Sequence, residues 1–164
     1  MIKFIPFLFI LFLQSDFGCF RSKITVPIVF QQNLNIVVPA GSNTVDLTDV
    51  INLSSNSSYA SAVNRYRSYK IESIQVQSTI FSGQSSSIDF DGMMSVGQNI
   101  TTPFKVKFPT DGLVKLNFTE TQLNDLTIFA RENPKFPLMF NGTLSSNTGA
   151  SITFRVLVNI NFYL

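Results

Sequence analysis

The sequence predicts a mainly β protein: an antiparallel β-sandwich or partly closed barrel with two short helices. Three observations carry this prediction. About eight segments have the period-two alternation of apolar and polar residues that is typical of half-buried strands. Turn-forming clusters of Gly, Pro, Asn and Ser separate these segments at short spacing. Only two segments have apolar residues at helical spacing. Many short strands with few helices are typical of antiparallel all-β domains.

The first half of the chain has five strand-like segments and one helical segment. The strands are expected at residues 24–30, 33–39, 45–51, 72–81 and 87–96. The last two, separated by a loop at 83–87, are expected to pair as an antiparallel hairpin. Ala60, Val63 and Tyr66 recur at helical spacing, which predicts a short helix near residues 58–68.

The second half has four more strand-like segments and the clearest helix. The strands are expected at residues 104–108, 114–118, 136–144 and 151–162. In the last strand a period of two predicts that the even-numbered side chains face the core. A helix is predicted over 119–133, because Thr119 is a natural N-cap, Gln122 completes a capping box and Pro134 follows as a stop.

The first residues resemble an export signal. A short positive start and an apolar run of about ten residues, too short to span a bilayer as a helix, are followed by Gly18 and Cys19. This arrangement resembles a bacterial lipobox, in which the peptidase cuts before a cysteine that carries lipid. The resemblance implies a signal peptide at 1–18, a lipidated tether at 19–23 and a single sandwich domain at 24–164.

The same resemblance implies a location and a partner. A lipid on Cys19 would attach the protein to the outer membrane, on its periplasmic or surface face. The alternative is plain secretion, for which five Asn-x-Ser/Thr sequons would serve as glycosylation sites.

Composition excludes several chemistries. The chain has no His, no Trp and one Cys, so a Ser-His-Asp triad, an internal disulfide and a CxxC metal site are impossible. A net charge of +2 with no basic run gives no reason to expect a nucleic-acid partner. Asp89 and Asp91 supply only two of the six to eight ligands that calcium requires, so they are interpreted as a solvated strand face. No enzymatic activity, metal site or cofactor is predicted.

One basic and aromatic cluster stands out as a candidate interaction surface. It consists of Arg65, Tyr66, Arg67, Tyr69 and Lys70. These side chains could stack on and pair with a glycan, a peptide or anionic headgroups. In the alternative interpretation, the Tyr rings cover the end of the sandwich and the cations only keep the helix soluble.

These observations predict a non-catalytic, lipid-anchored binding or structural protein of the cell envelope, with an envelope protein or glycan as partner. Two alternatives remain open at this point. One is a surface filament or adhesin subunit that assembles by β-strand addition at a sheet edge. The other is a carrier of an apolar ligand in a Phe-rich interior; the chain has 17 Phe.

Overall fold

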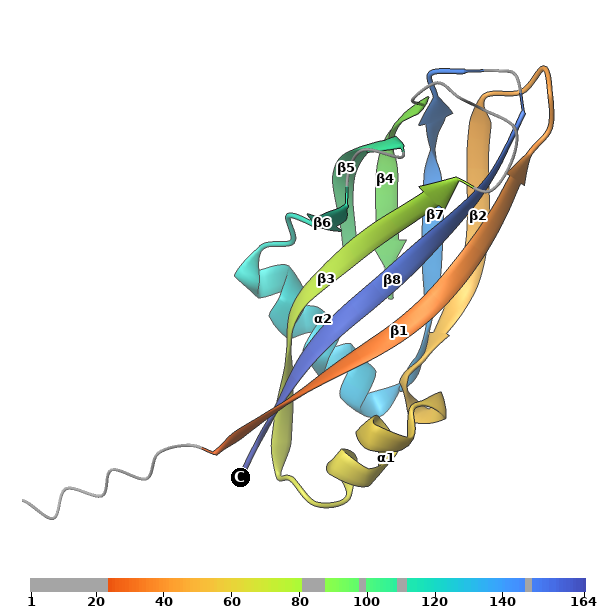
Figure 1. The fold of residues 1–164 in the computed structure, drawn as a ribbon. Helices are drawn as coiled ribbons and strands as arrows, with labels where there is room; N and C mark the ends of the chain where they lie inside the picture. The colour runs from red at the N-terminus through yellow and green to blue at the C-terminus, as the bar shows by residue number, and fades with distance from the viewer. Residues whose placement is uncertain (1–23, 81–87, 98–99, 109–111, 147–148) are drawn as a thin grey trace, which may run out of the picture.

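A computed structural model describes residues 24–80, 88–97, 100–108, 112–146 and 149–164. Over these residues the chain folds into two four-stranded antiparallel sheets packed face to face, with two α-helices at one end of the sandwich (Figure 1). The predicted signal peptide, tether and Cys19 lie outside the described residues.

The elements follow one another along the chain in a simple order. They are β1 (Thr25–Val38), β2 (Thr44–Asn52), a 3-10 turn (Leu53–Ser55), α1 (Ser57–Val63), β3 (Ser68–Ile80), β4 (Ile88–Val96), β5 (Ile100–Phe108), β6 (Leu113–Lys115), α2 (Glu120–Glu132), β7 (Lys135–Leu144) and β8 (Ala150–Tyr163).

The strand order identifies the kind of sandwich. The first sheet has the order β1-β8-β3-β6 and the second has the order β2-β7-β4-β5. The chain therefore crosses repeatedly between the sheets, and its last strand lies beside its first. Eight strands in two such sheets form a jelly roll. The predicted β-sandwich is confirmed, and the alternative of a partly closed barrel is not formed.

The predicted hairpin of residues 72–81 and 87–96 is wrong. β3 pairs with β8 and β6 in the first sheet, whereas β4 pairs with β5 and β7 in the second. Both strands have one apolar face, and these faces meet across the core instead of lying side by side. Alternation reports that one face is buried, but it does not say which strand is the neighbour.

Two predicted boundaries also differ from the structure. Residues 24–30 and 33–39 form one continuous strand, β1, because Gln31 and Gln32 continue the alternation through the expected break. The helix expected near 58–68 ends at Val63, and β3 begins at Ser68, four residues before the expected start.

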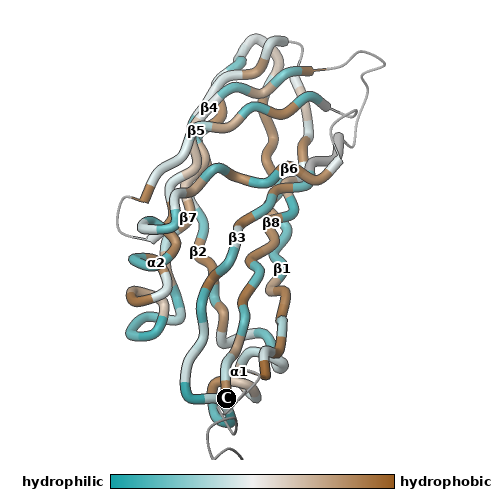
Figure 2. Tube along the Cα trace, turned by 90° about the vertical axis from the view of Figure 1, so that its left-hand side faces the viewer, coloured by the Kyte–Doolittle hydropathy of each residue, from teal (hydrophilic) through white to brown (hydrophobic). Residues whose placement is uncertain are grey.

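The core lies between the sheets, and β8 contributes the longest buried face. Its even-numbered side chains from Ile152 to Phe162 are at most 1% exposed, which confirms the predicted parity. Apolar and polar residues alternate along β3 and β8 in Figure 2. The rings of Phe90, Phe104, Phe140 and Phe154 pack against one another at the centre.

The helix α2 has the predicted capping box. Gln122 N–H donates to Thr119 Oγ1, and Thr119 N–H donates to Gln122 Oε1. Thr127 then ties this helix to β3, because its hydroxyl accepts from the Ile71 N–H at 3.0 Å and donates to the Leu123 carbonyl at 2.6 Å. The helix is thus held against the part of β3 that borders the candidate site.

Candidate functional site

In the structure, the residues of the predicted basic and aromatic cluster do not form one surface: the arginines are exposed and the tyrosines pack on the core. The turn between α1 and β3 leaves Arg65 and Arg67 exposed. Tyr66 is half-buried, with its ring 5.9 Å from that of Phe162. Tyr69 is only 6% exposed, 5.1 Å from the same ring. Both tyrosines therefore cover the end of the core.

Tyr69 also belongs to a buried hydroxyl pair that the sequence did not reveal. The Tyr59 hydroxyl, from α1, donates to the Tyr69 hydroxyl at 3.0 Å, and the two rings meet edge to face. Burial raises the pKa of Tyr59. Burial, and then the hydrogen bond with Tyr59, also raises the pKa of Tyr69. Both hydroxyls are held in their neutral form, which suits a structural contact.

This pair predicts a loss of stability at alkaline pH. The folded-state pKa values lie above the ordinary value of about 10, so the folded chain keeps protons that the unfolded chain releases. The free energy of unfolding contributed by the pair is therefore retained below about pH 10 and falls as the pH rises above it. Thermal melts from about pH 8 to about pH 11 should show a smaller loss for the double variant Tyr59→Phe, Tyr69→Phe than for the wild type. If the wild type and the double variant lost the same amount of thermal stability, the tyrosine pair would not be the cause of the loss.

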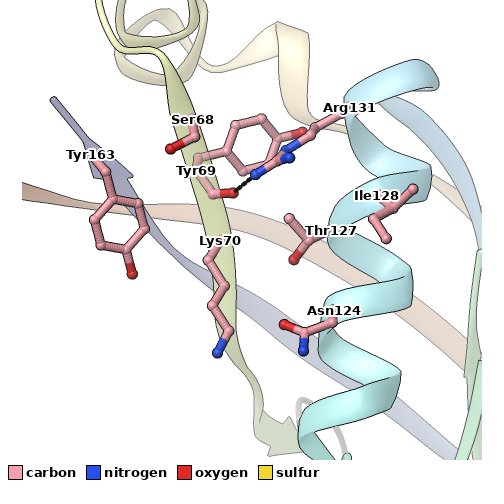
Figure 3. A pocket seen from close by; sticks show the side chains of 8 residues that line it. All are labelled: Ser68, Tyr69, Lys70, Asn124, Thr127, Ile128, Arg131 and Tyr163. Carbon is pink, nitrogen blue, oxygen red and sulfur yellow. Dashed lines mark hydrogen bonds between the residues drawn. The ribbon is translucent and has the colours of Figure 1, made fainter.

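An open groove of about 400 Å³ lies between α2, the start of β3 and the end of β8 (Figure 3). Arg131 of α2 reaches across it: its guanidinium lies 5.4 Å from the centre of the Tyr69 ring, and Nη2 donates to the Tyr69 carbonyl. The groove is thus bridged by a cation–π contact and a hydrogen bond that both fix α2 to β3. Arg131 was not predicted, because it is distant in sequence from the residues it contacts.

The other charged groups of the groove have partners as well. Lys70 Nζ lies 3.1 Å from Glu120 Oε1, a hydrogen bond that raises the pKa of Lys70. The Tyr163 hydroxyl donates to Glu72 Oε1 at 2.8 Å, which raises the pKa of Tyr163. The lining residues are Ser68, Tyr69, Lys70, Asn124, Thr127, Ile128, Arg131 and Tyr163. None of these eight side chains is a carboxylate, imidazole or thiol; the carboxylates of Glu120 and Glu72 meet the groove as the partners of Lys70 and Tyr163.

One of the two acidic residues on β4, Asp91, has an ion-pair partner on β5. Asp91 Oδ2 forms an ion pair with Lys105 Nζ at 2.6 Å, on an exposed part of the second sheet. Across the parts of the chain that the structure describes, no group of three or more Asp, Glu, His or Cys side chains is placed to hold a metal ion. In the same parts, no helix has the length and apolarity needed to cross a membrane.

The outer face of the first sheet carries a series of hydrogen bonds between side chains of neighbouring strands. Its side chains are mostly neutral amides and hydroxyls that bond to one another between strands. The bonds join Thr153 to Asn35 at 2.7 Å, Arg155 to Asn33 and Gln77 at 3.3 Å each, and Asn159 to Ser73 at 3.0 Å. Such a face makes contacts through hydrogen bonds and offers little net charge.

Three of the four sheet edges are obstructed. On β5, Pro103 has no N–H to donate to an added strand. The Thr101 carbonyl of the same strand already accepts a hydrogen bond from Gln122 Nε2 at 3.1 Å. On β2, the Val50 carbonyl accepts from Gln32 Nε2 at 3.1 Å. The edge strand β6 is only three residues long. Short strands, prolines and covering side chains are the usual means of preventing strand addition.

Comparisons with known proteins find similarity only among solved structures, and this similarity concerns the fold. No family model matches the chain, and no curated protein matches it. The decameric BFDV capsid protein is 10% identical with a TM-score of 0.52, covering 85% of this chain and 99% of that chain. The mud crab tombus-like virus structure is 11% identical with a TM-score of 0.47, covering 87% and 82%. The turnip yellow mosaic virus structure is 13% identical with a TM-score of 0.44, covering 87% and 94%.

These findings correct the leading functional prediction. The BFDV structure, with a TM-score of 0.52, is a capsid protein and not a lipid-anchored protein of a cell envelope. The prediction of a lipid-anchored envelope protein is therefore wrong, and the signal peptide, lipoprotein and outer-membrane assignments that belonged to it gain no support. The alternative of a surface filament or adhesin subunit fits better in its coarser part, that of a structural subunit. At these identities the likeness establishes the fold alone: the chain has the jelly-roll fold that the BFDV capsid protein also has.

Proposed function

We propose that the protein is a self-assembling structural subunit that acts through contacts between copies of itself. The observation that carries the proposal is the match to the BFDV capsid protein over 99% of that chain. That protein consists almost entirely of the fold seen here, and it forms a decamer. A jelly roll of this size therefore needs no further domain to serve as an assembling subunit.

The interior supports this proposal over the carrier alternative. The Phe140 and Phe154 rings stack at 5.1 Å, and Phe90 and Phe104 meet the same pair at their edges. These four rings occupy the middle of the space between the sheets, where an apolar ligand would have to lie. Protein interiors packed in this way have few voids larger than a water molecule.

The surface chemistry supports it as well. The outer face of the first sheet combines amide and hydroxyl groups with little net charge. Two copies of such a face can approach without the repulsion that a strongly charged face would cause. In the groove between α2 and β3, Lys70 is paired with Glu120 and Arg131 donates to the Tyr69 carbonyl, so both cations already have partners within the chain.

The experiment is a measurement of assembly state. The purified full chain should form ordered oligomers larger than a dimer as its concentration rises, seen by light scattering after size exclusion and by electron microscopy. The control is Phe154→Asp, which should give only irregular aggregates, because ordered particles require the folded subunit. A wild-type chain that remains a monomer at every concentration would contradict the proposal.

A further inference from the structure

The fourth sheet edge, on β1, is open. The Leu164 N–H donates to the Ile24 carbonyl, so even-numbered residues of β1 direct their backbone groups towards β8. Pro27, which has no N–H, accordingly stands at an odd-numbered position. The N–H and C=O groups of residues 29, 31, 33, 35 and 37 therefore point away from the sheet. Among the described strands, β8 is the one that pairs with β1, and it lies on the other side of these five residues.

This edge lacks the usual protection. β1 lies at the border of its sheet in Figure 1, and no other described strand covers it there. It has 14 residues, none of them charged, and its one proline, Pro27, lies near its start. Natural edge strands of this length are normally protected by lysines, bulges or prolines along the edge. The other three edges of this chain have such devices, so the exception at β1 is specific to one strand.

The side chains along the open edge are nearly symmetric in chemistry about Asn33, with an amide and then a valine on each side. Val29, Gln31, Asn33, Asn35 and Val37 occupy successive positions on the outer face. In an antiparallel pairing centred on Asn33, Val29 meets Val37, Gln31 meets Asn35, and Asn33 meets its own copy. The two valines are 51% and 76% exposed, so each one's apolar surface would be covered by the other.

We propose that two copies of the chain pair antiparallel through β1, about a twofold axis at Asn33, to form one continuous eight-stranded sheet. The proposal rests on the proposed function and names the partner: a second copy of this chain. A twofold contact of this kind uses the same patch on both subunits. Every outward N–H and C=O from residue 29 to residue 37 then finds a partner, and paired valines favour this register over its neighbours.

Electrostatics do not oppose the pairing. The nearest cation on this face, Arg155, is on β8 and donates to Asn33 within its own chain. Across the axis, the two copies of β8 would be three strand spacings apart, about 14 Å. That separation exceeds the Debye length of about 8 Å at physiological salt, so the two arginines are largely screened from each other.

The first test adds a proline to the open edge. Gln31→Pro removes one outward N–H without removing any bond to β8, and Pro27 shows that β1 accommodates proline at such a position. The full chain carrying Gln31→Pro should run as a monomer at concentrations where the wild type is a dimer or larger. The matched control Gln31→Ala keeps the N–H and should assemble like the wild type. A folded Gln31→Pro variant that still dimerises would overturn the proposal.

The second test determines which residues of the two β1 strands lie opposite each other. It does not require β1 to accommodate a further proline. In a Cys19→Ser background, Asn33→Cys should form an intermolecular disulfide on mild oxidation, because only this position faces its own copy. Gln31→Cys alone should not cross-link, whereas the double variant Gln31→Cys, Asn35→Cys should. Cross-linking of Gln31→Cys alone, or none at Asn33→Cys, would overturn the register.

The outcomes separate this inference from the proposed function. Ordered particles that form equally well with Gln31→Pro, and without a disulfide at position 33, would overturn the β1 pairing and leave the assembly function intact. A dimer linked at position 33 that never grows further would support the pairing and contradict the assembly function. A wild type that stays monomeric at every concentration would contradict both.

Discussion

Replacing Phe154 with aspartate is expected to unfold the domain. Phe154 is fully buried, stacked on Phe140 and contacted at its edges by Phe90 and Phe104. Loss of a core phenylalanine ring costs about 3–5 kcal/mol. A buried, unpaired carboxylate adds several more. Because whole domains are stable by only about 5–15 kcal/mol, the folded state should no longer dominate. Far-UV circular dichroism against temperature measures the effect.

Asn159→Asp is the matched control on the same strand. Asn159 stands at an odd-numbered position on the outer face, and its amide donates to the Ser73 hydroxyl at 3.0 Å. That hydroxyl can turn and donate to a carboxylate, so the variant should lose less than about 1 kcal/mol. Similar melting temperatures for the two variants would show that the buried face of β8 has been assigned incorrectly.

Gly92→Ala is expected to have the second largest effect. Gly92 of β4 lies opposite Gly142 of β7, and the tip of the buried Phe90 ring lies over both. A Cβ at position 92 would stand 2.6 Å from Phe90 Cζ and 2.7 Å from Gly142 Cα. The ring could shift, but the backbone of the paired central strand could not. Overpacking of this kind costs about 1–3 kcal/mol or more, and chemical denaturation measures it.

Gly112→Ala is the control for this substitution. A Cβ at Gly112 would meet no atom within 4 Å, so the midpoint of denaturation should stay close to that of the wild type. Gly142→Ala should resemble Gly92→Ala, because its Cβ would lie 2.6 Å from the same Phe90 atom. If all three variants melted together, the glycine pair would not be a packing requirement.

Features set by neighbours along the chain were predictable. The capping box at Thr119 and Gln122 needs only residues three positions apart, and it formed as expected. The buried parity of β8 follows from the pleat of a single strand, whichever strands lie beside it. In both cases the deciding interaction is encoded within a few residues.

The candidate site was predictable only in part. Residues 65–70 were interpreted as one cluster because they adjoin in sequence, but a turn and the start of β3 place them on different faces. Tyr69 points into the core, and Lys70 points out towards Glu120. Arg131 and Thr127, which hold α2 against β3, gave no local signal, because each bonds to a residue more than fifty positions away.

The sequence by itself determined that the protein is built of alternating strands with one well-capped helix, because side-chain period and capping are local properties. Only the tertiary structure decided that β3 and β4 lie in different sheets, and that β1 is left as an open edge. In a jelly roll, paired strands can lie far apart in the sequence, as the pairing of Thr25 with Tyr163 shows. Alternation is equally compatible with several partners, so the choice depends on packing between both sheets, which no single segment encodes.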